Sequence, residues 1–211
     1  MSLYEAFKNV SIGEIEKNAQ YFSIYERYLH KYKNNPCRLF LIIDGDHSLA
    51  QAEMWRKYLG GFSIIVCITE SDYNGNQIFC REGNIDDKHF RENLFLEFGC
   101  PDIVIDDGSH MPNDTIKNFE IFSKTLSHNG LYFVEDVYTS YWRNYEGGLL
   151  RENTFIEYTK SLIDELHACH TGQDIPPNAF SEKFCGIHIY DGLIVFESGK
   201  YFDRRSIKNI S

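Results

Sequence analysis

The sequence predicts an α/β fold with a doubly wound, mostly parallel sheet that ends in an antiparallel β-hairpin. Short apolar runs alternate with longer amphipathic stretches through most of the chain, and this alternation is typical of strands and helices in a parallel sheet. Near the end, two strand-like runs are joined directly by Asp191 and Gly192. This residue pair favours a tight type I′ hairpin turn, so the last two strands are expected to be antiparallel.

The first segment differs from the rest because its apolar residues recur at helical spacing from residue 3 to residue 33, and Pro36 then ends the pattern. We therefore expect an N-terminal helical appendage over residues 1–36 and an α/β domain over residues 37–211. Tyrosines at positions 21, 25, 28 and 32 give the appendage a tyrosine-rich face, which suits either a homo-oligomer interface or a lid.

The remaining elements follow in order from the pattern of apolar residues. The predicted strands are residues 39–43, 63–68, 77–79, 102–105, 131–134, 186–190 and 193–197. The predicted helices are residues 49–59, 87–98, 114–126 and 153–169, and residues 171–181, with two prolines, are expected to form a loop or lid. Strand and helix in regular alternation predict a Rossmann-like sheet with helices on both faces.

The charge balance excludes some classes of partner. The 211 residues include 31 Asp and Glu against 21 Lys and Arg, which gives a formal net charge of −10. Such a field repels nucleic acid and anionic membrane surfaces, so we expect neither as a partner. The six cysteines contain no C-x-x-C pair, and no stretch is apolar enough for a signal or membrane segment. These features favour reduced, structural thiols in a cytoplasmic protein.

Acidic residues follow two of the predicted strands directly. Asp106 and Asp107 come after one strand with His110 three residues further on, and Glu135 and Asp136 come after the next. Ligands of doubly wound sheets bind beyond the carboxyl ends of the strands, so these side chains are expected at one edge. Oxygen ligands suit a hard divalent cation, with magnesium the default and manganese or calcium as alternatives. The competing interpretation is that the acids only cap the following helices.

Two long runs carry a resemblance to a known family. Residues 101–110 (PDIVIDDGSH) and 130–142 (GLYFVEDVYTSYW) resemble the metal-dependent macrocin and mycinamicin type of sugar O-methyltransferase. These enzymes are class I methyltransferases that use S-adenosylmethionine (SAM). The similarity continues in residues 154–157 (TFIE), 160–166 (KSLIDEL) and 186–197 (GIHIYDGLIVFE). It covers roughly residues 101–197 well and the first hundred residues poorly.

The resemblance implies roles for the residues at the acidic strand ends. The family's magnesium ligands correspond to Asp107, Glu135 and Asp136, and its general base corresponds to His110. Chelation of a sugar hydroxyl on Mg²⁺ would stabilise the alkoxide while His110 accepts the proton. Tyr138 and Tyr141 follow these acids, and we expect them to contact the sugar, although packing over the sheet edge is the alternative.

The cofactor motif departs from the family pattern. A SAM site needs a glycine-rich turn after the first strand and an acid after the second. This chain offers Asp44 and Gly45, with Leu49 and Ala50 at the later glycine positions, and Glu70 one residue beyond the expected acid. In place of the family's adenine-contacting polar pair stand Asn84 and Ile85. With Asp106, these residues form the predicted cofactor site: Asp44, Gly45, Glu70, Asn84, Ile85 and Asp106.

The sequence therefore predicts a SAM-dependent and Mg²⁺-dependent O-methyltransferase that acts on a hydroxyl of a sugar or a sugar-decorated small molecule. Two other functions stay open. The departures in the glycine motif are also expected of a non-catalytic descendant that has lost SAM but keeps the metal and acceptor edge. The acid and histidine cluster would serve another metal-dependent enzyme, although one histidine with several carboxylates matches the two-histidine iron triad poorly.

Overall fold

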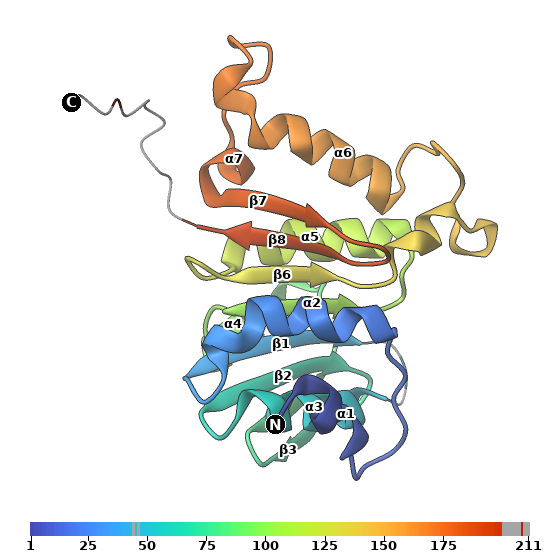
Figure 1. Cartoon of the computed structure of the whole chain (residues 1–211), viewed down its shortest axis with the longest axis vertical. Helices are drawn as coiled ribbons and strands as arrows, with labels where there is room; N and C mark the ends of the chain where they lie inside the picture. Colours follow the sequence, from blue (N-terminus) through green and yellow to red (C-terminus); the bar gives the residue numbers. More distant parts are fainter. Residues whose placement is uncertain (44, 46, 200–207, 209–211) are drawn as a thin grey trace.

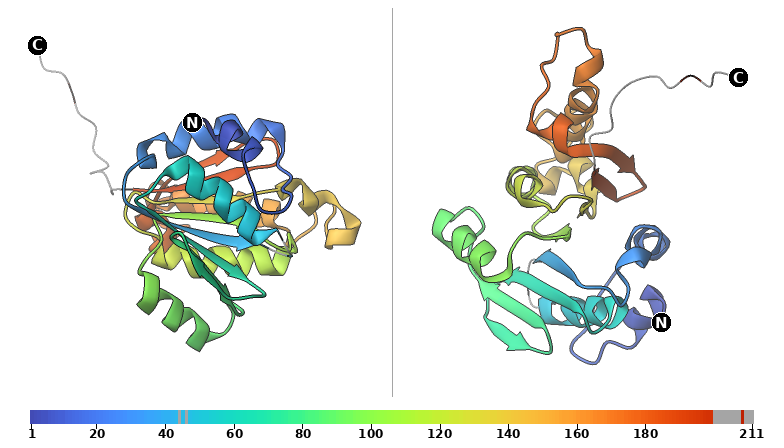
Figure 2. Two further views of the ribbon diagram at one scale, coloured as in Figure 1. Left: turned by 90° about the horizontal axis from the view of Figure 1, so that it is seen from below. Right: turned by 90° about the vertical axis from the view of Figure 1, so that its left-hand side faces the viewer.

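The fold is an eight-stranded sheet with helices on both faces, which confirms the predicted α/β class (Figures 1 and 2). The structure, a computed structural model, describes residues 1–43, 45, 47–199 and 208. The strand order is β3-β4-β2-β1-β5-β6-β8-β7. The strands are β1 (Cys37–Ile43), β2 (Ser63–Thr69), β3 (Tyr73–Gly75), β4 (Ile78–Glu82), β5 (Ile103–Asp107), β6 (Leu131–Val134), β7 (Phe184–Ile189) and β8 (Ile194–Ser198).

The helices cover the two faces of the sheet in separate groups. They are α1 (Leu3–Lys8), α2 (Ala19–Leu29), α3 (Ser48–Leu59), α4 (Lys88–Phe98), α5 (Pro112–Thr125), α6 (Phe155–Leu166) and α7 (Ala179–Lys183). Helices α1, α2 and α3 share one hydrophobic core with the sheet, and α4, α5 and α6 share the other. Strand β1 supplies both cores because alternate side chains point to opposite faces, with Leu39 and Leu41 in one core and Phe40 and Ile42 in the other.

The central strands are parallel and the end of the chain is antiparallel. Strand β1 pairs in parallel with β2 and β5, and β5 pairs in parallel with β6. Strand β8 runs antiparallel to both β6 and β7, so the predicted hairpin is present. The turn itself differs from the expectation: Gly192 has a φ of 81°, whereas Asp191 is not among the residues with positive φ. A type I′ turn requires positive φ at both positions.

The N-terminal segment is helical in two separate pieces rather than continuously. Helix α2 lies over the sheet (Figure 1), and its residues Tyr21 and Tyr25 are each only 1% exposed. Those two tyrosines belong to the same core as β1 and α3, so they are not available for an interface with a second copy. The boundary at residues 36 and 37 and the homo-oligomer stay predictions. None of the helices among the described residues combines the length and apolar character needed to cross a bilayer.

Candidate functional site

Parallel pairing brings the predicted acidic residues to one edge of the sheet. In the β5–β6 ladder Asp106 lies opposite Val134, and the backbone N–H of Glu135 donates to the Asp106 carbonyl at 2.9 Å. The side chains of Asp107, Glu135 and Asp136 therefore emerge beside one another at the carboxyl ends of two neighbouring strands. We call these three residues the acidic edge.

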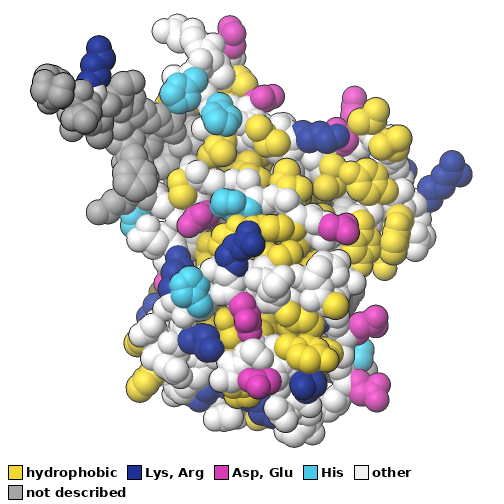
Figure 3. All heavy atoms as spheres, in the orientation of Figure 1, with side chains coloured by type: hydrophobic (Ala, Val, Ile, Leu, Met, Phe, Trp, Pro, Cys, Tyr) yellow, Lys and Arg dark blue, Asp and Glu magenta, His cyan; other side chains and the backbone are white. Residues whose placement is uncertain are grey.

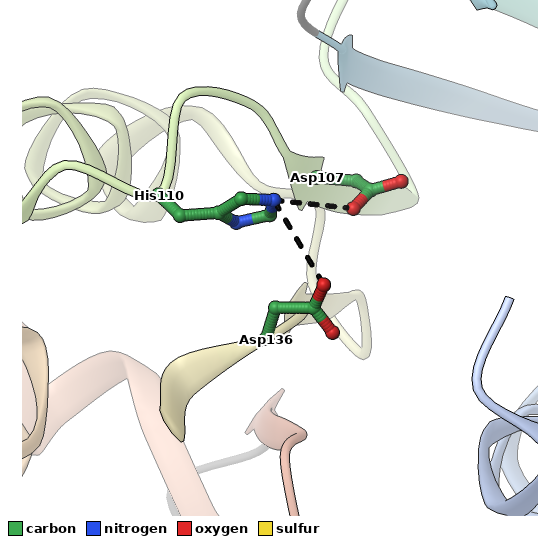
Figure 4. Close-up of side chains that lie close together, drawn as sticks. All are labelled: Asp107, His110 and Asp136. Carbon is green, nitrogen blue, oxygen red and sulfur yellow. Dashed lines mark ion pairs between the residues drawn. The ribbon is translucent and has the colours of Figure 1, made fainter. Parts of the chain in front are cut away.

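Asp107, His110 and Asp136 converge on a common centre (Figure 4). His110 Nε2 lies 3.8 Å from Asp107 Oδ1 and 4.0 Å from Asp136 Oδ2. One ligand atom from each residue lies within 4.8 Å of the other two. These separations are longer than direct hydrogen bonds and leave space between the three groups. The two carboxylate oxygens suit a divalent cation that prefers oxygen ligands, so the acids fit the predicted metal, and the imidazole nitrogen faces the same space.

Two of these three residues have a backbone conformation that is uncommon for their type. His110 has a φ of 56° and Asp136 a φ of 53°, both in the left-handed region. Such conformations cost about 1–3 kcal/mol each and persist where the surrounding structure requires them. Here they aim both side chains at the space beside Asp107, which supports a functional role for the cluster.

A lysine from the N-terminal segment lies within the acidic edge. Lys17 Nζ donates to Asp107 Oδ2 at 2.6 Å and to both carboxylate oxygens of Glu135 at 2.7 Å. Its side chain is 3% exposed. Burial alone would lower the pKa of Lys17, but the attraction of Asp107 and Glu135 outweighs burial and raises it. Lys17 is therefore a buried ammonium ion.

The same N-terminal segment also donates to Asp136 and, through a second residue, to Glu135. Asp136 Oδ1 accepts from Asn18 Nδ2 at 3.0 Å and from the Tyr21 hydroxyl at 2.7 Å. The Tyr25 hydroxyl donates to Glu135 Oε1 at 2.6 Å. Burial, together with the neighbouring carboxylate, raises the pKa of Tyr25, so its hydroxyl stays protonated and acts as a donor. Residues 17–25 thus support every carboxylate of the acidic edge.

A cavity of about 310 Å³ opens beside the acidic edge, and we call it the acidic cavity. Besides the three carboxylates, Lys17, Asn18 and His110, its wall includes Tyr138, Trp142 and Tyr145. The Tyr138 and Trp142 rings lie 5.1 Å apart between centroids. Of the two tyrosines expected at the sugar site, Tyr138 lines this cavity, whereas Tyr141 is 46% exposed and is not in its wall.

A second cavity, of about 300 Å³, lies at the carboxyl ends of β1, β2 and β4, and we call it the strand-end cavity. Its wall contains three predicted cofactor residues, Glu70, Asn84 and Ile85. The isoleucines 42, 43 and 68 add apolar surface, and Gly108 and Ser109 connect the wall to the acidic strand end. This position is where a doubly wound sheet binds a nucleotide-like ligand. The residues present therefore fit a cofactor with an apolar ring and hydroxyl groups.

The other predicted cofactor residues are placed differently. Gly45 follows β1 with a φ of 79°, a conformation that favours glycine, but it is not in the wall of the strand-end cavity. Asp44 lies outside the described residues. Asp106 is 3% exposed and is not in the cavity wall; its carboxylate accepts from Asn118 Nδ2 at 3.2 Å and from the Tyr132 hydroxyl at 3.1 Å. Burial raises the pKa of Asp106 to about 7, against the effect of these hydrogen bonds.

Sequence reasoning did not identify Lys17, Asn18 and Gln51 as site residues. Gln51 Nε2 donates to Asp107 Oδ2 at 2.7 Å, from helix α3. These partners lie 56 to 118 positions away from the acids that they contact, so no local spacing signals them. The sequence predicts Tyr21 and Tyr25 on a face for an oligomer interface or a lid, and it does not predict that their hydroxyls donate to Asp136 and Glu135.

Comparisons with known proteins show what this fold and chain are similar to. No family model matches the chain. A structure of the MycE methyltransferase of mycinamycin biosynthesis in complex with Mg, S-adenosylhomocysteine (SAH) and mycinamycin VI superposes with a TM-score of 0.82. The superposition covers 99% of this chain and 56% of that chain at 24% identity. It establishes the shared fold.

Curated sugar O-methyltransferases are similar to this chain in sequence, which confirms the resemblance. A tetracenomycin-C rhamnosyl 3'-O-methyltransferase of Streptomyces olivaceus is 29% identical over 189 residues, covering 84% of this chain and 48% of the relative. The mycinamicin VI 2''-O-methyltransferase of Micromonospora griseorubida is 26% identical over 192 residues, covering 83% and 47%. The chain spans about half the length of the curated relatives it matches.

Proposed function

We propose that this chain carries the active site of a SAM-dependent and Mg²⁺-dependent O-methyltransferase that acts on a sugar hydroxyl. The observation that carries the proposal is the position of the cluster formed by Asp107, His110 and Asp136. Its members line the acidic cavity, and Gly108, between two of them, lines the strand-end cavity. A methyl donor in one cavity and a hydroxyl acceptor in the other would meet at this cluster.

When bound, SAM supplies the electrophilic methyl group and Mg²⁺ supplies the positive charge that acidifies the acceptor hydroxyl. Asp107 Oδ1 and Asp136 Oδ2 are the carboxylate oxygens turned toward His110, and they would hold the ion. His110 Nε2 faces the same centre and would accept the hydroxyl proton as the oxygen–methyl bond forms. Glu70, at the end of β2, would accept hydrogen bonds from the ribose of the cofactor.

The acceptor proposed is a sugar, free or attached to an apolar small molecule. Tyr138 and Trp142 give the acidic cavity an aromatic wall, and aromatic faces suit the apolar face of a sugar ring. Leu149 and Leu150 are 79% and 69% exposed, and Figure 3 shows hydrophobic side chains on the right of the molecule, where the loops before α6 lie in Figure 1. The relatives named above act on rhamnosyl tetracenomycin and on mycinamicin VI, which supports a sugar on a larger apolar acceptor.

The proposed place of action is the cytoplasm, because the cysteine pattern of the sequence favours reduced thiols. The net charge of −10 supports a small-molecule acceptor rather than nucleic acid or an anionic membrane surface.

Calorimetric titration tests the proposal. SAM and SAH are titrated into the protein with Mg²⁺ in excess and, separately, with EDTA, at up to roughly millimolar ligand, the upper end of usual KM values. Saturable binding of both cofactors supports the proposal. Absence of binding by either would contradict it and would favour the non-catalytic alternative.

A further inference from the structure

Three aromatic rings line the acidic cavity beside its carboxylates. The Tyr138 and Trp142 rings lie 5.1 Å apart between centroids at an angle of 44°, and the Trp142 and Tyr145 rings lie 6.0 Å apart at 57°. Because neighbouring rings are inclined to one another rather than stacked, they form a curved wall that can contact a bound group on more than one side. The faces of aromatic rings attract cations as well as apolar groups.

The cation that the protein itself places in this wall is fully engaged elsewhere. Of the described residues that line the acidic cavity, Lys17 is the only lysine or arginine. An ammonium group has three donors, and Lys17 Nζ makes three hydrogen bonds, to Asp107 Oδ2 and to both carboxylate oxygens of Glu135. The Lys17 side chain is 3% exposed, so its charge acts on these two carboxylates and not on a ligand in the cavity.

Glu16 adds a further carboxylate to the same wall, outside the acidic edge. It lines the acidic cavity and also a neighbouring cavity of about 650 Å³, whose wall includes Glu14, His47 and Gln51. Within the part of the chain that the structure describes, the Glu16 carboxylate has no ion pair and no side-chain hydrogen bond. An unpaired carboxylate in a cavity with aromatic ring faces is suited to a positively charged amine.

We propose that the acceptor is an amino sugar, whose ammonium group lies in the acidic cavity against the faces of Trp142 and Tyr145 with Glu16 as its counter-ion. The inference rests on the proposed function, because it names the class of sugar that the same site methylates. A neutral sugar would contact the ring faces through its C–H groups and would gain only an ordinary hydrogen bond from Glu16. An ammonium group uses both the ring faces and the charge.

Two sugars of nearly equal size test the inference. Methyl β-D-glucosaminide carries an ammonium group where methyl β-D-glucoside carries a hydroxyl. Each is titrated into the protein with SAH and Mg²⁺ present, and binding is followed by the fluorescence of Trp142, since the second of the two tryptophans, Trp55, is 0% exposed. The amino sugar is expected to bind about 5–30-fold more tightly, the range for a cation on a desolvated aromatic face.

Equal affinities, tighter binding of the neutral glucoside, or no binding of the amino sugar would each overturn the inference. None of these results affects the binding of SAH, which is measured first and on which the proposed function depends. Failure of the inference and failure of the proposed function are therefore distinguishable.

A matched pair of substitutions shows whether the preference comes from the acidic cavity. Glu16→Gln is expected to lower the ratio of the two affinities by about two- to fivefold, the range for a partly exposed ion pair. Glu14→Gln removes the same charge two positions away, and Glu14 lines the larger cavity but not the acidic cavity, so the ratio should stay at the wild-type value. An equal fall in both variants would indicate a long-range effect of charge and would overturn the inference.

Trp142→Leu examines the aromatic part of the wall separately, with calorimetry in place of fluorescence. Loss of the ring face should lower the affinity for the amino sugar more than the affinity for the neutral glucoside, by about fivefold, while SAH affinity stays at the wild-type value. A loss that is the same for both sugars would mean that the ring packs against sugar C–H groups only, and it would contradict the place proposed for the ammonium group.

Discussion

The acidic edge and the strand-end cavity lie at the same end of the sheet but are built in opposite ways. The acidic edge consists of charged groups joined by short hydrogen bonds to residues 17–25 and to α3. The strand-end cavity has a mostly neutral wall of isoleucine, asparagine and threonine, with two exposed acidic residues, Glu70 and Asp114. The charges of its side chains therefore define the acidic edge. The strand-end cavity is defined instead by the backbone segments that follow the strands.

Two buried carboxyl groups, Glu135 and Asp106, differ in which neighbouring groups oppose the effect of burial on their pKa. Burial raises the pKa of Glu135 to about 7, with Asp107 adding to the effect and Lys17 opposing it. Burial also raises the pKa of Asp106 to about 7, and there only neutral donors oppose it. Lys17 gives Glu135 a direct counter-ion, whereas Asp106 depends on an amide, a hydroxyl and a backbone N–H. The two regions should therefore respond differently to substitution.

Asp107→Asn is expected to have the largest effect on transfer because Asp107 touches both Lys17 and the proposed ion. We expect kcat to fall by at least roughly 10⁴-fold, since metal charge and the orientation of His110 are lost together. Turnover of SAM to SAH with a glycoside acceptor measures it. Asp164→Asn, an exposed position on α6, is the charge-matched control and should leave kcat unchanged. Activity close to wild type in Asp107→Asn would mean that the acidic edge is not the reaction centre.

His110→Ala is expected to lower kcat by about 10²–10⁴-fold, the usual contribution of a general base. Mn²⁺ affinity should change much less than kcat if His110 acts on the proton rather than as a main ligand. Measuring both quantities on the same variant separates these roles. A parallel loss of Mn²⁺ binding would assign His110 to the metal instead.

Glu70→Gln is expected to act on the strand-end cavity alone. Loss of a charge-assisted hydrogen bond to the ribose should weaken SAH binding by about tenfold, because such bonds contribute about 1.5–3 kcal/mol and this side chain is exposed to solvent. Mn²⁺ affinity should not change. Calorimetry with each ligand checks both, and a variant that loses Mn²⁺ but keeps SAH would reverse the assignment of the two regions.

Asp106→Asn is expected to have the smallest effect on transfer, and to change the pH dependence of stability instead. The folded-state pKa of about 7 lies above the usual value near 3.9 in an unfolded chain. The wild-type protein should therefore lose free energy of unfolding as the pH rises from about 4 to about 7, and Asp106→Asn should lack this contribution. Urea unfolding of both proteins across this range measures the difference. A difference that does not change with pH would contradict the raised pKa.

The sequence predicted the sheet because its signals are local. The apolar runs at residues 63–68 and 131–134 nearly coincide with β2 and β6, and the paired acids after β5 and β6 meet as expected. The short edge strand β3 was not predicted, since Tyr73–Gly75 is exposed or half-buried and has no apolar pattern.

The partners of the acids could not be predicted for a different reason. Lys17 becomes buried only through contacts with residues 90 and 118 positions further along the chain, and a single lysine before a helix normally lies in solvent. Similarly, Trp142 lines the acidic cavity while Tyr141 does not, because the 3₁₀ turn Val137–Tyr141 decides which ring points inward. Such choices depend on the folded backbone rather than on spacing.

A crystal structure of the protein with SAH and Mn²⁺ tests the central claim most directly, because it reports on both regions at once. The account predicts SAH in the strand-end cavity beside Glu70, and an anomalous peak for Mn²⁺ between Asp107 and Asp136. SAH bound elsewhere, or no Mn²⁺ at the acidic edge, would contradict the account.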